Sequence, residues 1–226
     1  MKWIFFLVTL LPITPTFRGK ILRLFFHNCI GKSFSIGFFC FIDSKNIKIG
    51  NNVCVGNCVR IKYLDALTIG DNSSIGSSTV VCGAYDNLKY HDRDLYIGDN
   101  CKILSSHYFD VVAPISIGNR VVIAGKWTQF YTHSFDLNGD RLDGPISIGD
   151  NVYIGAGSII NLGVNISSNI VIQGGTCVNG SIYESGVYTS ISFKKRGEVR
   201  EYDDLFKDAS STVFSDGKKA YYRELK

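Results

Sequence analysis

A six-residue repeat constrains the fold of this chain more than any other feature of its sequence. The phrase Ile-Gly-Asp/Asn-Asn/Arg recurs, and residues of the same period follow six and twelve positions after each copy. The copies begin at Ile49, Ile69, Ile97, Ile117 and Ile148, the sixth positions are Val55, Ile75, Ile103, Ile123 and Ile154, and the twelfth are Ile61, Val81, Phe109, Gln129 and Ile160. A period of six excludes an amphipathic helix, whose side chains repeat every 3.6 residues. It indicates a parallel β-helix of triangular coils, in which each repeated side chain points into the prism and small residues form the corners.

The spacing of the coils predicts where the chain leaves the prism. The step from Ile148 to Ile166 is 18 residues, one coil of three hexads, whereas the earlier steps are 20, 28, 20 and 31 residues. The first two hexads of each coil look intact, so we expect every insertion to lie after the third hexad begins. All extra loops would then leave one edge of the prism, and the long ones span about residues 82–95 and 130–145. Long loops gathered on a rigid scaffold are where sites are usually built.

These features divide the chain into three parts. Residues 1–35 are an N-terminal apolar and amphipathic segment with a short helical element. We expect residues 36–183 to form an all-β domain, a left-handed parallel β-helix of hexapeptide repeats, and residues 184–226 to form a C-terminal tail. Because a solenoid needs its open ends covered, we expect the two flanking segments to act as caps.

The N-terminal segment combines apolar residues with cations. The apolar run from Trp3 to Leu11 is too short to span a bilayer, and no small-residue cleavage site follows it. The next stretch carries Arg18, Lys20 and Arg23 among apolar residues, so a helix here would be amphipathic. Two interpretations stay open: the helix lies on a membrane surface, or it caps the β-helix or packs in an oligomer.

Composition narrows the class of protein. The 226 residues are 45% hydrophobic and 19% charged, which is typical of a folded domain. The net charge of +4 suits an anionic cofactor or membrane face, and because no nucleic-acid-binding motif accompanies it, we expect no nucleic-acid partner. Seven cysteines without short paired spacings favour a reducing compartment over a disulfide framework. The four histidines include no closely spaced pair, so we expect no metal site.

The second long loop carries the motif that points to a function. It reads Thr-His-Ser-Phe-Asp over residues 132–136 and, after a gap, Gly-Pro-Ile-Ser-Ile-Gly-Asp-Asn-Val-Tyr-Ile-Gly over residues 144–155. These two segments, in this order on this repeat, resemble the hexapeptide-repeat O-acetyltransferases, a family that includes galactoside, maltose and bacterial surface-polysaccharide acetyltransferases. The resemblance covers roughly residues 36–183. It implies an acyltransferase that uses acetyl-CoA as donor and needs no metal.

The resemblance implies a general base and direct transfer. His133 falls on the family's catalytic histidine, and it would take the proton from an acceptor hydroxyl that then attacks the acetyl thioester. Imidazole suits this role because its unperturbed pKa lies near neutrality. A backbone N–H near Gly155 and Ala156 would hold the oxyanion. The alternative for His133 is a loop histidine that makes only structural hydrogen bonds.

The resemblance also places the donor on the uninterrupted coils between residues 148 and 178. Ala156, Gly174 and Asn179 sit where the pantetheine arm of coenzyme A runs in the family, and small residues suit a ligand that lies against backbone. The basic run of residues 194–196 would meet the phosphates of the coenzyme or form a solvated surface.

Aromatic residues of the loops are candidates for the acceptor site. Tyr85, Trp127 and Tyr131 could stack on the apolar faces of a sugar, although each is also explained by packing. By the repeat arithmetic, His107 lies one coil below Trp127, where it lines an acceptor pocket or stacks on that ring.

These residues predict an O-acetyltransferase that acts on a sugar hydroxyl of a bacterial surface glycan such as an O-antigen or capsule. The nearest alternative is an N-acetyltransferase acting on an amino sugar nucleotide, and a non-catalytic β-helix scaffold or a zinc enzyme are further ones. Related proteins form trimers, so we expect a homotrimer. We expect the protein in the cytoplasm, in peripheral contact with the inner face of the membrane.

Overall fold

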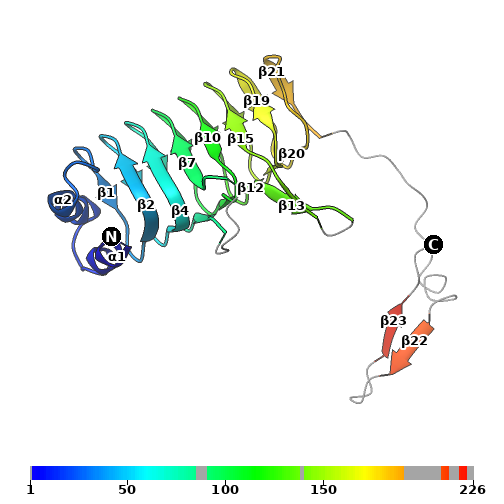
Figure 1. Cartoon of the computed structure of the whole chain (residues 1–226), viewed down its shortest axis with the longest axis horizontal. Coiled ribbons are helices and arrows are strands. Elements are labelled where there is room, and N and C mark those ends of the chain that lie inside the picture. Colours follow the sequence, from blue (N-terminus) through cyan, green and yellow to red (C-terminus); the bar gives the residue numbers. More distant parts are fainter. Residues whose placement is uncertain (1, 85–90, 138–139, 191–209, 214–218, 223–226) are drawn as a thin grey trace. The chain divides into compact units, whose positions relative to one another are not determined.

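The computed structural model describes residues 2–84, 91–137, 140–190, 210–213 and 219–222. The chain divides into two compact units, Met1–Ser190 and Ile191–Lys226. The described part of the second unit is an antiparallel hairpin of β22 (Ser210–Val213) and β23 (Lys219–Tyr222). The first unit is the left-handed parallel β-helix that the hexapeptide repeat predicts, with two helices before it (Figure 1).

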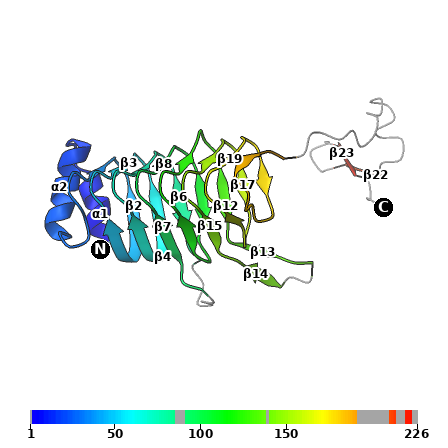
Figure 2. The same ribbon diagram turned by 90° about the horizontal axis from the view of Figure 1, so that it is seen from above.

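The prism has three faces, and strands of successive coils pair in parallel along each of them (Figures 1 and 2). An eight-stranded sheet forms the face that we call face 2. Its strands, in spatial order, are β1 (Ser35–Ile36), β3 (Cys54–Val55), β5 (Ser74–Ile75), β8 (Lys102–Ile103), β11 (Val122–Ile123), β16 (Tyr153–Ile154), β19 (Ile170–Ile172) and β21 (Gly186–Tyr188).

The other two faces form one eleven-stranded sheet, because β2 (Phe41–Ile49) and β4 (Arg60–Ile69) run through the corner between them. Face 1 is built from the ends of these two strands and from β7 (Asp94–Ile97), β10 (Ile115–Ile117), β15 (Ile146–Ile148) and β18 (Asn165–Ile166). Face 3 is built from their beginnings and from β6 (Val80–Cys82), β9 (Tyr108–Asp110), β12 (Gln129–Tyr131), β17 (Ile159–Ile160) and β20 (Cys177–Val178).

Three corners join the faces, and each has its own chemistry. At the corner between faces 1 and 2, the side chain of one coil accepts a hydrogen bond from the backbone N–H of the coil before it, as Asp99 does from Asp71 and Asn119 from Asp99. The corner between faces 2 and 3, which we call the second corner, holds residues with positive φ such as Ser106 and Trp127. The corner between faces 3 and 1 carries the long insertions, and we call it the loop corner.

One register prediction was wrong. In the coil that begins at Ile117, Phe130 points inward and pairs with Phe109 on one side and Ile160 on the other, whereas Gln129 is half-buried on the outer surface. The rings of Phe109 and Phe130 stack at a centroid distance of 4.5 Å. The cause is one extra residue at the second corner of this coil, so not every insertion lies at the loop corner.

Two helices cover the first coil, α1 (Lys2–Thr9) and α2 (Pro15–Phe25), as predicted for a helical N-terminal element. Arg18 of α2 is fully buried and donates hydrogen bonds to the carbonyl oxygens of Leu11, Ile13 and Ile36. Gly19 lets α2 approach closely, because a Cβ there would lie 1.8 Å from the Phe34 carbonyl oxygen. Neither helix is long and apolar enough to cross a membrane, and the same holds for the rest of the described chain.

The other end of the β-helix lies near β21. This strand pairs in parallel with β19, and Ile182 forms a bridge with Ile166. The predicted domain limits at residues 36 and 183 stay predictions, and the first compact unit continues to Ser190.

Candidate active site

His133 lies at the loop corner, where β12 ends and the hairpin strand β13 (His133–Phe135) begins. Its Nδ1 is 2.5 Å from Oδ2 of Asp110, the last residue of β9 in the preceding coil. The Asp110 side chain is buried, whereas that of His133 is 32% exposed. Because a carboxylate only accepts hydrogen bonds, a neutral imidazole in this position carries its proton on Nδ1 and its lone pair on Nε2. This is the tautomer that a general base requires.

Asp110 was not singled out from the sequence. It is 23 residues before His133 in the chain but pairs directly with Tyr131, two residues before the histidine. Burial raises the pKa of the Asp110 carboxyl, and the hydrogen bond from His133 opposes that shift. The sequence signal that could have identified Asp110 is an aspartate at the end of a strand, one coil before the histidine of the loop. The extra residue at the second corner hid this alignment from the repeat arithmetic.

Thr132 fixes the backbone beside His133. Its side chain is fully buried, and Oγ1 accepts hydrogen bonds from the N–H groups of Val112 and Ala113 at 2.8 and 3.0 Å. The same hydroxyl donates to the Asp110 carbonyl oxygen at 2.8 Å. The Thr132 hydroxyl therefore ties the strand that carries the histidine to the strand that carries its carboxylate partner.

The second long loop continues as a β-hairpin. Strand β13 pairs antiparallel with β14 (Arg141–Asp143), and the hairpin projects from the prism (Figure 2). The Phe135 ring lies edge-on to the His133 imidazole at a centroid distance of 5.8 Å, and Gly144 N–H donates to the Thr132 carbonyl oxygen where the chain returns. The hairpin thus forms one wall beside the exposed side of His133.

Cys82 is a neighbour of the pair, since it is opposite Asp110 in the adjacent strand. Burial raises the pKa of the Cys82 thiol, and the Asp110 carboxylate raises it further. The thiolate is the nucleophilic form of cysteine, so this environment disfavours a reactive Cys82.

The predicted donor residues lie at two different corners. Ala156 and Gly174 are neighbours at the second corner, where a Cβ on Gly174 would lie 3.0 Å from the Ala156 carbonyl oxygen. Asn179 follows β20 at the loop corner, where its Oδ1 accepts a hydrogen bond from Asn161. Face 3 separates the two corners, so a single chain does not bring Ala156 and Gly174 next to His133.

The backbone near Ala156 leaves one N–H group for a ligand. Gly155 N–H donates to the Ile172 carbonyl oxygen at 2.8 Å and Gly157 N–H to that of Lys126 at 2.9 Å. Within the described part of the chain, the Ala156 N–H has no such partner. Of the predicted oxyanion donors, the Gly155 N–H is therefore already engaged and that of Ala156 is available.

Comparison with known proteins identifies the family. No protein-family model matches the chain. The galactoside O-acetyltransferase of Escherichia coli is 30% identical to it over 148 residues, which are 62% of this chain and 69% of that protein. The chain belongs to the hexapeptide-repeat O-acetyltransferase family. It is an acyltransferase.

Two further matches are shorter or more distant. The bifunctional protein GlmU of Thermosipho melanesiensis is 33% identical to the acyltransferase over 110 residues, which are 49% of this chain but 22% of that protein. The UDP-N-acetylglucosamine acyltransferase of Campylobacter jejuni matches 68% of this chain and 64% of its own, with a TM-score of 0.51 and 17% identity. The latter likeness shows a shared fold alone.

Of the three aromatic residues predicted for the acceptor site, two lie at opposite edges of face 3 and one lies outside the described residues. Trp127 is at the second corner and is 70% exposed. Tyr131 lies at the other edge of the same face, its ring 5.9 Å from that of Tyr108 and its hydroxyl hydrogen-bonded to Gln129 Oε1. Tyr85 is outside the described residues, as is the basic run of residues 194–196.

His107 of the acyltransferase is a buried, neutral histidine. It aligns with Thr128, whose backbone N–H donates to its Nδ1 at 3.2 Å, and burial lowers its pKa to about 4. The residue paired with Trp127 is Ser106, whose carbonyl accepts the Trp127 N–H, so the predicted alignment of His107 with Trp127 was one residue out. His107 and Trp127 do line one surface pocket of about 380 Å³, together with outward residues of face 3.

Among the described residues, no group of three His, Cys, Asp or Glu side chains gathers in a way that could hold a metal ion.

Proposed function

We propose that this acyltransferase transfers an acetyl group from acetyl-CoA to a sugar hydroxyl of a bacterial surface glycan, with His133 as general base. The observation that carries the proposal is the hydrogen bond between His133 Nδ1 and the buried Asp110 carboxylate. It leaves a lone pair on a partly exposed Nε2, beside a hairpin on a rigid scaffold. A base held in one tautomer by a carboxylate is the arrangement that activates hydroxyl nucleophiles.

In the proposed step one proton moves, a carbon–oxygen bond forms and a carbon–sulfur bond breaks. Nε2 of His133 accepts the proton of the acceptor hydroxyl as that oxygen bonds to the thioester carbonyl carbon. The Asp110 carboxylate stabilises the imidazolium that forms. When the carbon–sulfur bond breaks, Nε2 returns the proton to the leaving sulfur, so the products are an acetyl ester and free coenzyme A thiol. The unreactive environment of Cys82 supports direct transfer without an acyl-enzyme.

The second corner supplies the proposed donor groove. Cβ-free Gly174 lies against the Ala156 carbonyl, and Gly157 and Gly175 face open space, so a thin chain such as a pantetheine arm fits along the backbone there. The Ala156 N–H would donate to the oxyanion that develops on the thioester oxygen. Asn179 would contact the same arm from the loop corner.

We propose a homotrimer because the proposed parts lie on opposite edges of face 3. A neighbouring prism that presents its second corner to the loop corner of the first would bring Ala156 and Gly174 to His133. The same contact would bring the exposed Trp127 of one subunit toward Tyr131 of the next. These two rings and Tyr85 are the proposed stacking surfaces for the sugar.

O-acetylation and N-acetylation differ in the acceptor group. An amino sugar nucleotide would present an amine where a glycan presents a hydroxyl, and the His133 base would serve either. We place the enzyme in the cytoplasm at the inner face of the membrane, where lipid-linked glycan units are assembled.

The test is release of coenzyme A thiol from acetyl-CoA by the full chain, with bacterial glycans, small sugars and amino sugar nucleotides as acceptors. We expect release that depends on a hydroxyl acceptor and that His133→Ala abolishes, while acetyl-CoA still binds to the variant. Full transfer by His133→Ala would overturn the assignment of the base. Release with amine acceptors alone would replace O-acetylation by N-acetylation.

A further inference from the structure

The excess positive charge of the chain is concentrated in the N-terminal cap. Residues 1–42 contain five Lys and Arg residues and no Asp or Glu, whereas the rest of the chain has 19 Lys and Arg against 20 Asp and Glu. The Arg18 guanidinium is buried and donates hydrogen bonds to three backbone carbonyl oxygens, so it is not available to a partner. Lys20, Arg23 and Lys32 are exposed. Lys2 forms an ion pair with Asp43, so within the described residues the exposed cations of the cap without an acidic partner are Lys20, Arg23 and Lys32.

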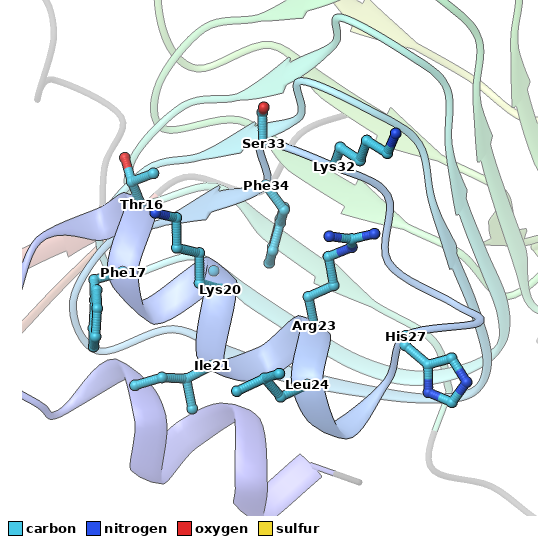
Figure 3. A pocket seen from close by; sticks show the side chains of 11 residues that line it. Thr16, Phe17, Lys20, Ile21, Arg23, Leu24, His27, Lys32, Ser33 and Phe34 are labelled. Carbon is cyan, nitrogen blue, oxygen red and sulfur yellow. The ribbon is translucent and has the colours of Figure 1, made fainter.

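Helix α2 has three sides of different composition. Arg18, Gly19 and Leu22 face the β-helix and are buried. Figure 3 shows Phe17, Ile21 and Leu24 along a second side, and Lys20 and Arg23 along a third side nearer to Lys32. The helix therefore presents an apolar stripe next to a basic stripe, in addition to the side that packs on the protein.

The apolar and the basic stripe line the same pocket. A pocket of about 940 Å³ is lined by both of them and by Lys32 and Ser33 of the first coil, with His27 at its end (Figure 3). Among the described residues that line it, none is acidic. We call the six residues Phe17, Lys20, Ile21, Arg23, Leu24 and Lys32 the basic apolar face.

Large apolar side chains of the two N-terminal helices are exposed to an unusual degree. Leu24 is 81% exposed, Phe25 62%, and Trp3 and Leu7 of α1 63% and 60%. Exposed apolar clusters of this kind mark interaction surfaces in soluble domains. Tryptophan, leucine and phenylalanine next to Lys and Arg are the composition of helices that lie in the interface of a bilayer.

We propose that the basic apolar face docks on an anionic phospholipid bilayer, with Lys20, Arg23 and Lys32 at the headgroup phosphates. Phe17, Ile21 and Leu24 then enter the boundary between headgroups and acyl chains. The inference extends the proposed location at the membrane and needs no acetyl transfer. Charge complementarity selects this partner over a second copy of the face, because a symmetric contact would set the same cations against each other.

The experiment is sedimentation of the full chain with phosphatidylcholine vesicles, with and without phosphatidylglycerol, at low and high salt. We expect binding to the anionic vesicles that is lost at high salt, because exposed charges are screened. Each basic residue near an anionic surface strengthens binding about fivefold. The double variant Lys20→Glu/Arg23→Glu should therefore bind at least about twentyfold more weakly, and Leu24→Ser should also bind the anionic vesicles more weakly at low salt.

Matched variants separate the face from general charge and hydrophobicity. Lys48→Glu/Lys102→Glu makes the same change of charge at exposed positions of the β-helix wall, and Leu137→Ser removes a leucine elsewhere that is at least as exposed as Leu24. Both should bind vesicles as the unmodified chain does. Equal binding to neutral and anionic vesicles, no binding to either, or equal losses in the matched variants would each overturn the proposal. Because thiol release with a water-soluble acceptor is measured without vesicles, failure here is distinguishable from failure of the acetyltransferase proposal.

Discussion

Nδ1 of His133 is 2.5 Å from Oδ2 of Asp110, although 23 residues separate them in the chain. The stacking of coils produces this contact, because the strand before the histidine pairs with the strand that ends at the aspartate. The parallel pairing of the strands therefore fixes the position of Asp110, and the loop hairpin fixes that of His133. The pairing predicts that the two residues act as one unit.

Asp110→Asn should lower kcat by roughly a hundredfold to ten-thousandfold, with little change in the KM for acetyl-CoA. The amide is nearly isosteric, but its NH₂ group can donate to Nδ1, which moves the imidazole proton to Nε2 and removes the lone pair that accepts the substrate proton. Steady-state thiol release measures both constants. The matched control is Asp99→Asn at the corner between faces 1 and 2, where Asn119 already fills the equivalent place in the next coil. Equal activity of the two variants would exclude a positioning role for Asp110.

Thr132→Val should destabilise the fold and lower activity together. The change leaves the buried N–H groups of Val112 and Ala113 without their acceptor, which costs about 2–5 kcal/mol in the free energy of unfolding. Thr132→Ser keeps the hydroxyl and should stay within about 1 kcal/mol of the unmodified protein. Denaturant unfolding of the three proteins measures the difference. A serine variant as unstable as the valine variant would show that the methyl group, and not the hydroxyl, fixes the strand.

Much of the fold was predictable because each coil of the β-helix corresponds to a repeated phrase in the sequence. Each Ile-Gly-Asp/Asn phrase places one aliphatic side chain inside and one turn outside, so period and face follow from counting. The error at Gln129 shows the limit of that counting. One extra residue at Gly125-Lys126 moves Phe130 into the prism, and the sequence contains no mark that separates a corner insertion from a loop insertion.

The site was less predictable than the fold. His133 was recognisable because its motif is local, and its role remains a proposal. Asp110 was missed because its contact depends on the pairing of two coils, and a shift of one residue changes which side chains meet. The separation of Ala156 and His133 across face 3 is likewise a property of the closed prism that no local motif contains.

Phe130→Ala should cost about 3–5 kcal/mol in the free energy of unfolding, because it opens a cavity beside the stacked ring of Phe109. Gln129→Ala should cost less than about 1 kcal/mol, since Gln129 lies on the outer surface. Thermal or denaturant unfolding of the two variants tests the register directly. The opposite order would restore the alignment in which Gln129 points into the prism.

His107 should make the stability of the protein depend on pH below neutrality. Burial lowers its pKa from 6.5 to about 4, so between these values the unfolded chain binds a proton that the folded chain does not. The free energy of unfolding contributed by this group is therefore complete above pH 6.5 and decreases as pH falls toward 4, by roughly 3 kcal/mol in total. His107→Thr places in this position the residue found at Thr79 and Thr128, its neighbours in the same buried column. Denaturant unfolding at several pH values should give a shallower dependence for His107→Thr than for the unmodified chain, whatever the change in stability at neutral pH. Identical slopes for the two proteins would mean that the folded state protonates His107 as readily as the unfolded state does.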